Sequence, residues 1–222
     1  MMLSLLISML LAAGTPTAAR PLVVRGAVGG EALELQNDWV RVWRLKLAPH
    51  EKTPIAEHLP LVTVYLTDAR LRVTGADGRT ENVMQAAGTV AYRSGARYGE
   101  DNLSDRPLEA IVVELKPGAT KSPRITLDPV VLDPQYHTVP FENDRVRVLR
   151  TVLAPHVKSP LHEHPHYVVV YLTELHTTME LGDGRVVDNP RRAGEVAWRD
   201  AMKHATENIG EQTAVEIQVE VK

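Results

Sequence analysis

Apolar and polar residues alternate over short stretches along most of the chain, which is the pattern of half-buried β-strands. Val40-Arg41-Val42 and Val146-Arg147-Val148 place an apolar side chain at every second position. Gly, Pro and Asp residues interrupt such runs about every 8 to 12 residues, a spacing typical of sandwiches and barrels. Asp77-Gly78 and Asp183-Gly184 predict hairpin turns, because Gly accepts the positive φ that a type I′ turn requires. No segment beyond the N-terminus has a helical period, so the pattern predicts an all-β chain.

The chain contains an internal duplication. When the sequence is aligned with itself at a shift of 106 positions, about 30 of roughly 80 paired residues are identical, and the alignment needs no gap. Asn37–Val42 then meets Asn143–Val148, and Val64–Thr67 meets Val170–Thr173. The two repeats predict an N-terminal roll within residues 20–116 and a C-terminal roll within 136–222. Residues 117–135, which are punctuated by prolines, are predicted to link them.

The N-terminus has the features of a secretory signal. The apolar run 3–13 is shorter than the roughly 20 residues that cross a membrane, and small residues follow it at 14–19. We predict a signal peptide over residues 1–19 and an exported protein, periplasmic or secreted. No Lys or Arg precedes the apolar run, so a buried N-terminal helix or strand is the alternative. No other segment approaches membrane-spanning length, and no membrane association is expected after cleavage.

Composition narrows the chemistry. The net charge is −3, which gives no sign of the basic stripe of a nucleic-acid-binding protein. The chain has no Cys, so a metal ion would need His, Asp or Glu ligands. Seven of the nine His lie after residue 136, which directs attention to the second repeat.

A cluster of His in the second repeat predicts a metal site. His162 and His164 are two apart, so in a strand their side chains point to the same face, and His204 can add a third imidazole from another strand. Neutral imidazole suits Fe, Cu, Ni and Zn, so the ligand type does not select the metal. The alternative is a set of ordinary core or surface histidines. The first repeat has Ala56, His58 and Tyr98 at these positions, and we expect that roll to be structural.

These motifs resemble those of the cupins, and two of them in tandem resemble a bicupin, that is, two jelly rolls in one chain. The cupin pattern has Gly, five residues, His-x-His, three or four residues and Glu, and a second motif with Gly, a later His, and Asn shortly after it. His162-x-His164 and Gly194…His204…Asn208 match the ligand positions. More narrowly, the runs 142–148, 168–173 and 204–210 resemble small cupins named beta-alanine degradation protein. Two positions depart from the pattern: His156 stands where the first motif has Gly, and Val168 where it has the Glu ligand.

The resemblance implies a non-haem metal enzyme. Three-His cupins occur among iron dioxygenases, so Fe(II) is the first expectation, with Zn, Ni, Mn or Cu as alternatives. Without the Glu, three neutral ligands leave the metal charge uncompensated, which favours an anionic small-molecule substrate. The catalytic residues are unknown. The candidates are His166, expected on the strand face of His164, and two carboxylates expected to point inward, Glu180 and Glu216.

Two other functions stay open at this point. A non-catalytic bicupin would capture a small ligand or a metal ion, and a structural module would have lost both sites. The chain is expected to be a monomer or a homodimer.

Overall fold

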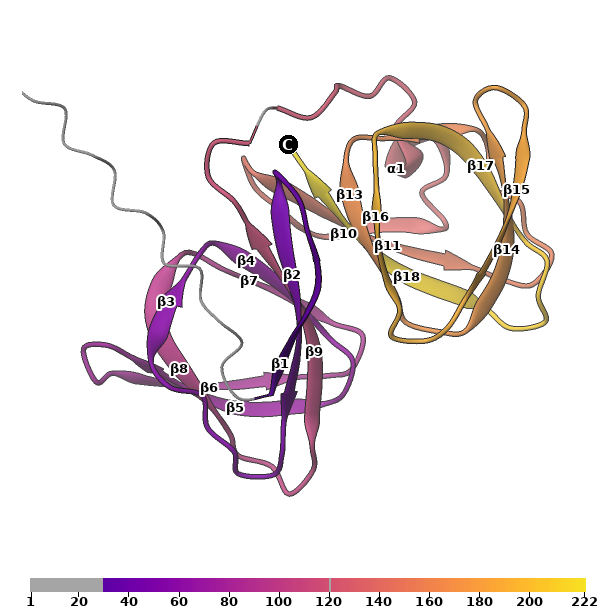
Figure 1. Ribbon diagram of the computed structural model, residues 1–222. Helices are drawn as coiled ribbons and strands as arrows, with labels where there is room; N and C mark the ends of the chain where they lie inside the picture. The colour runs from indigo at the N-terminus through magenta and orange to yellow at the C-terminus, as the bar shows by residue number, and fades with distance from the viewer. Residues whose placement is uncertain (1–29, 120) are drawn as a thin grey trace, which may run out of the picture.

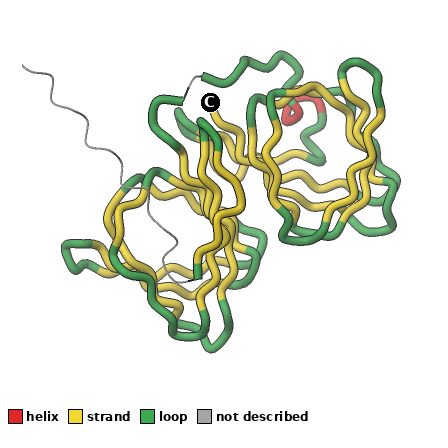
Figure 2. Tube along the Cα trace, viewed as in Figure 1, coloured by secondary structure: helices red, strands yellow, loops and turns green. Residues whose placement is uncertain are grey.

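The computed structural model describes residues 30–119 and 121–222, and the predicted signal peptide lies outside them. Two rolls of β-strands lie side by side (Figure 1), and the described chain contains one short helix on the C-terminal roll (Figure 2). The predicted all-β architecture of two tandem jelly rolls is confirmed. No helix in the described residues is long and apolar enough to span a membrane.

The N-terminal roll consists of two sheets. The five-stranded sheet has the order β1-β2-β9-β4-β7, and the four-stranded sheet has the order β3-β8-β5-β6. The strand bounds are β1 Glu31–Gln36, β2 Val40–Leu47, β3 Ala56–His58, β4 Leu61–Tyr65, β5 Ala69–Gly75, β6 Thr80–Gln85, β7 Val90–Arg93, β8 Ala96–Asn102 and β9 Leu108–Leu115.

The C-terminal roll repeats this topology. Its five-stranded sheet has the order β10-β11-β18-β13-β16, and its four-stranded sheet the order β12-β17-β14-β15. The bounds are α1 Pro129–Leu132, β10 His137–Glu142, β11 Val146–Leu153, β12 His162–His164, β13 Tyr167–Tyr171, β14 Leu175–Leu181, β15 Val186–Arg191, β16 Val196–Arg199, β17 Met202–Asn208 and β18 Ala214–Val221.

The turns follow the residues that the sequence places there. Gly78 and Gly184 have φ of 79° and 83° in the hairpins β5–β6 and β14–β15, as predicted. His50 and His156 have φ of 60° and 62°, in the left-handed region that Gly adopts most easily. His156 stands where the cupin pattern has Gly, a residue that would suit this positive φ.

The outer faces of the two five-stranded sheets pack against each other. One apolar cluster joins alternate residues of both sheets, including Val42, Val113, Val148 and Ile217, and each is 1% exposed or less. Because alternate strand residues point to opposite faces, the remaining positions fill the two roll interiors. The rolls therefore share one core between them and have separate interiors.

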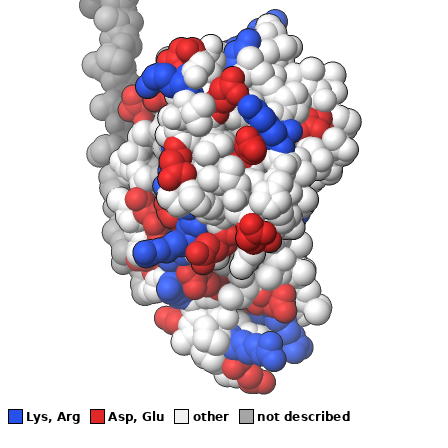
Figure 3. Space-filling view, turned by 90° about the vertical axis from the view of Figure 1, so that its right-hand side faces the viewer, with Lys and Arg blue, Asp and Glu red and all other residues white. Residues whose placement is uncertain are grey.

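The segment between the rolls packs on the C-terminal roll. The Glu163 carboxylate accepts hydrogen bonds from the backbone of Thr126 and Leu127 at 2.7 and 3.2 Å, and Asp128 caps helix α1. The surface of this roll that faces the viewer in Figure 3 carries acidic and basic side chains interspersed.

Candidate metal centre

Two strands of the four-stranded sheet bring the three predicted ligands together. In the antiparallel register of β12 and β17, His162 lies directly opposite His204, and His164 lies one step along the same face. Each side chain offers one ligand atom, and these atoms all lie within 4.8 Å of one another. The three residues are 1% to 4% exposed. The predicted triad is thus a buried cluster inside the C-terminal roll.

Each imidazole is oriented through its Nδ1 atom. His162 Nδ1 lies 2.8 Å from the Pro160 carbonyl oxygen, His164 Nδ1 lies 2.7 Å from Glu220 Oε1, and His204 Nδ1 lies 3.1 Å from Thr206 Oγ1. Fixing Nδ1 in this way leaves Nε2 for a metal ion, the arrangement common at His-ligated metals. The Nε2 atoms of His164 and His204 are buried and have no hydrogen-bond partner among the described residues. A buried polar atom without a partner costs about 1–3 kcal/mol, so a metal ion fits this donor set.

The electrostatics keep the three histidines neutral. Burial lowers the pKa of His162, and it lowers the pKa values of His164 and His204 well below the ordinary value. The neighbouring imidazoles lower the pKa of His164 and of His204 further, because positive charges would repel within one cluster. A neutral imidazole has the lone pair that a metal ion needs.

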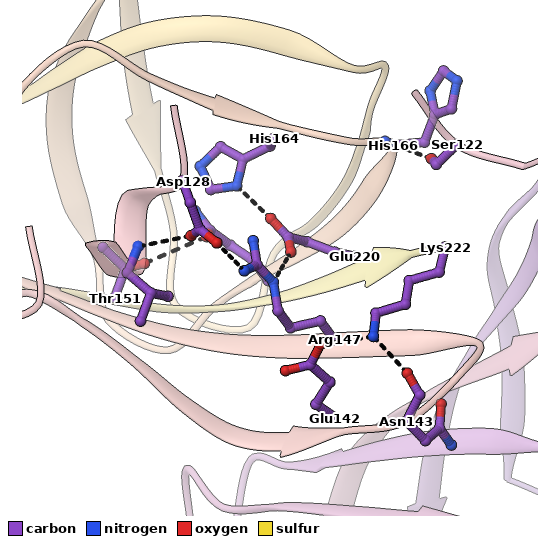
Figure 4. Close-up of polar contacts among 12 residues, drawn as sticks. Ser122, Asp128, Glu142, Asn143, Arg147, Thr151, His164, His166, Glu220 and Lys222 are labelled. Atoms are coloured by element: carbon purple, nitrogen blue, oxygen red, sulfur yellow. Dashed lines mark hydrogen bonds and ion pairs between the residues drawn. The ribbon is translucent and has the colours of Figure 1, made fainter. Parts of the chain in front are cut away.

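A chain of charged groups supports His164. Glu220, which is 1% exposed, joins His164 to Arg147, whose Nε lies 2.6 Å from Glu220 Oε2. Arg147 in turn donates to Asp128 at 2.7 Å (Figure 4). Burial raises the pKa of Glu220, and the bonded Arg147 opposes this shift. The chain thus fixes the orientation of the His164 ring through its Nδ1 atom.

A small cavity adjoins the cluster inside the roll. Its volume is about 20 Å³, room for one or two water molecules. The lining residues include His162, His204, Thr206, His137, Thr151, Thr177, Glu216 and Gln218. A ligand that fits this cavity has only a few atoms.

His137 and Glu220 are site residues that the sequence analysis missed. The ring of His137 lies edge-on to that of His162 with centroids 5.2 Å apart, and burial lowers its pKa to about 4. Glu220 has a counterpart in the first repeat, Glu114, so the repeat pattern alone indicates a structural role. One sequence signal points to His137: its counterpart in the first repeat is Glu31, so the histidine occurs only in the repeat that has the triad.

Two of the catalytic candidates, His166 and Glu180, do not lie at the cluster. His166 was expected on the face of His164, but β12 ends at His164 and the chain turns before β13. The His166 ring instead lies near Trp39 and Trp198, at centroid distances of 4.6 and 5.7 Å (its place away from His164 is seen in Figure 4). Glu180 is half exposed and pairs with Lys158 at 2.7 Å. Glu216, in contrast, lines the cavity.

Strand β13 has Val at both positions that the cupin spacing allows for the Glu ligand, Val168 and Val169. Val168 is fully buried in the apolar cluster between the two rolls. The inward positions of β13 are Tyr167, Val169 and Tyr171. A carboxylate at residue 168 would therefore point away from the histidines. In the first roll, His58 stacks on Tyr98 with ring centroids 4.0 Å apart.

No family model matches the sequence, and no curated protein matches it. The fold is similar to solved structures at low sequence identity. AerE from Microcystis aeruginosa has a TM-score of 0.62 at 10% identity, covering 82% of this chain and 88% of that chain. The cupin 2 conserved barrel domain protein from Leptotrichia buccalis has a TM-score of 0.55 at 12% identity, covering 86% and 88%.

Oxalate decarboxylases are also similar in fold. The Lactobacillus farciminis enzyme, in a formate complex, has a TM-score of 0.61 at 12% identity, covering 88% of this chain and 82% of that chain. A Bacillus subtilis oxalate decarboxylase with Mn(II) centres has a TM-score of 0.56 at 13% identity, covering 82% and 68%. At these identities the similarity establishes the fold and no activity. The chain therefore has the cupin fold, as two jelly rolls in tandem.

Proposed function

We propose that the C-terminal roll binds one divalent metal ion through His162, His164 and His204, and that the protein is a metal-dependent enzyme acting on a small anionic molecule. The observation that carries this proposal is the convergence of three neutral, oriented imidazoles within 4.8 Å, two of them with a buried Nε2 that has no partner in the described chain. The large majority of buried side-chain nitrogens have a hydrogen-bond partner, so two Nε2 atoms without one in the same cluster point to a ligand.

The ligand set favours an anion. Three imidazoles contribute no negative charge, and the nearby Glu220 carboxylate is already bonded to His164 and Arg147. An anionic ligand would therefore supply the charge that the protein does not. The cavity of about 20 Å³ restricts that ligand to a few atoms.

When bound, the metal would act as a Lewis acid and as a template for the ligand. The protein's own residues orient the imidazoles through Pro160, Glu220 and Thr206, and the buried cavity limits the entry of water. Fe(II), with dioxygenation as the reaction, stays our first hypothesis. Mn(II) is to be tested beside it, because the Bacillus subtilis enzyme of similar fold has Mn(II) centres. The narrower resemblance to the beta-alanine degradation cupins stays a prediction, as does export.

A second function, capture of a metal ion or small ligand without turnover, is favoured by the size of the cavity. The two functions differ in a simple assay. Metal-free protein is loaded with Fe(II) or Mn(II), and its melting temperature and the consumption of O₂ and of small carboxylic acids are measured.

If the protein is an enzyme, metal should raise its melting temperature and allow product formation, and both effects should be lost in His164→Ala. The matched control is His58→Ala, the equivalent change in the first roll, which should keep both. A ligand at a hundred times its dissociation constant stabilises by about 2.7 kcal/mol, a shift that is easily measured. Stabilisation without any product would favour capture, and no stabilisation by any metal would contradict both functions.

A further inference from the structure

The interiors of the two rolls differ in polarity at equivalent positions. The interior of the first roll contains Leu45, Ala110 and the partly buried Val112. The equivalent residues of the second roll are polar, and they are Thr151, Glu216 and Gln218. These three residues line the cavity beside the histidines. The polar set therefore occurs in the roll that has the triad and is replaced by aliphatic residues in the roll that lacks it.

The three polar residues form a hydrogen-bonded chain that ends at the cavity. Thr151 Oγ1 donates to Gln218 Oε1 at 3.4 Å, and Gln218 Nε2 donates to Glu216 Oε1 at 2.7 Å. This bond holds Oε1 of Glu216, and the Glu216 side chain lines the cavity. Glu216 lies opposite Tyr171 in the β13–β18 register, on the inner face of the sheet. The chain thus holds the Glu216 carboxyl group at the cavity.

The fold does not require this chain. Placing polar groups inside a roll costs free energy compared with apolar packing, even where they are bonded to one another. The first roll has the same topology and packs Leu45, Val112 and Ala110 instead. A costly feature that is confined to the roll with the histidines points to a role at the site.

We propose that Glu216 is the acid–base residue of this metal site, positioned by Gln218 and Thr151. This inference rests on the proposed function. An anion bound at the metal shares the small cavity with the Glu216 carboxyl group, and two negative charges so close disfavour each other. Glu216 therefore takes one proton from solvent as the anion binds, and its O–H group donates to the anion. In a reaction, this is the proton that the group can transfer and recover.

The surroundings of Glu216 contain charges of both kinds. Burial raises its pKa, while the Gln218 hydrogen bond and the nearby Arg199 and Arg191 lower it. The titratable groups that face it or share its cavity come from β10, β12, β13, β15, β16 and β17, and they are His137, His162, Tyr167, Tyr171, Arg191, Arg199 and His204. Because a histidine could also take up the proton, the test needs a variant that changes Glu216 alone.

The experiment measures formate binding to the Mn(II)-loaded protein by calorimetry between about pH 6 and pH 7. Formate is the probe because it is the smallest carboxylate. Uptake of one proton predicts that formate affinity falls as the pH rises, by up to about tenfold per pH unit where Glu216 is ionised in the free protein. In Glu216→Gln, which keeps the bond from Gln218 and cannot ionise, the affinity should be independent of pH. Gln218→Val introduces the residue that the first roll has at the equivalent position, Val112, and it should weaken the pH dependence. The control is Glu180→Gln, a half-exposed glutamate of the same roll that pairs with Lys158, which should behave as the parent.

The outcomes separate this proposal from the metal site itself. Equal pH dependence in the parent and in Glu216→Gln would overturn it, and so would pH-independent binding in the parent. Mn(II) that binds without any formate binding would also overturn it, while leaving the metal centre intact. Failure of all variants and the parent to bind metal would instead contradict the proposed function. Equal metal content in the parent, Glu216→Gln and Glu180→Gln shows that the variants are folded at the site.

Discussion

Replacing Glu220 by Gln tests how the protein orients a metal ligand. The two carboxylate oxygens of Glu220 accept from His164 at 2.7 Å and from Arg147 at 2.6 Å. A Gln side chain has one oxygen and one NH₂ group, so it can accept from only one of these donors. If the NH₂ group faces His164, Nδ1 must become the acceptor and the proton must move to Nε2. That tautomer cannot bind a metal ion through Nε2.

The magnitude follows from this geometry. Loss of a partner that orients a metal-bound histidine lowers metal affinity about 10- to 100-fold, which corresponds to about 1.4–2.7 kcal/mol. The variant also loses stability, because a buried charged pair is broken. Arg147 nevertheless keeps its hydrogen bond to Asp128 at 2.7 Å. We therefore expect less than the roughly 3–5 kcal/mol that a fully unpaired buried charge costs.

The assay is competition for Mn(II) or Zn(II) between the protein and a chelating dye. Glu114→Gln is the matched control, because Glu114 is equally buried in the first roll and binds Arg41 at 2.6 Å and Trp43 at 3.0 Å. The control should lose stability without losing metal affinity. Equal metal affinity in Glu220→Gln, Glu114→Gln and the parent would refute the reasoning.

Three further predictions concern stability. His204→Leu, which replaces the imidazole by an apolar side chain of similar size, should abolish metal binding but cost the metal-free protein less than about 1 kcal/mol in thermal denaturation, because it removes a buried nitrogen without a partner in the described chain; a loss above about 3 kcal/mol would show that the histidine is structural. The pKa of His137 is lowered to about 4, so the neutral form is favoured in the fold and the metal-free protein should lose stability as the pH falls from about 6.5 to 4. Replacing His137 by Gln should reduce this slope by up to about 1.4 kcal/mol per pH unit, and an unchanged slope would contradict the assignment. Ile217→Ala and its counterpart Ile111→Ala, both in the cluster between the rolls, should each cost about 2–5 kcal/mol in denaturant unfolding and keep one transition; two separate transitions would mean that the rolls unfold independently.

The fold could be predicted because its determinants are local and repeated. Alternation at Val40–Val42 and Val146–Val148 predicts strands with one buried face, and the Asp-Gly dipeptides predict hairpins. The shift by 106 positions then shows that the same unit occurs twice. The pairing of His162 with His204 depends on the register of two strands, and the two residues are 42 positions apart in the chain. The resemblance to the cupins predicted that these residues belong to one site.

The rest of the site depends on contacts that no local pattern encodes. His166 was placed by extending strand alternation past Pro165, but the turn there reverses the face that the chain presents. Glu220 reaches His164 across the interior, and its counterpart Glu114 bonds Trp43 instead. The same residue at equivalent positions thus has two roles, which are decided by the partner that the fold brings to it.

The central claim is that His162, His164 and His204 hold a metal ion. The direct measurement is elemental analysis of the purified protein beside the double variant His162→Ala/His204→Ala, both after reconstitution with Fe(II), Mn(II) and Zn(II) in turn. We predict about one equivalent of metal in the parent and none in the variant. Equal metal content in the two proteins, or no metal in either, would contradict the account.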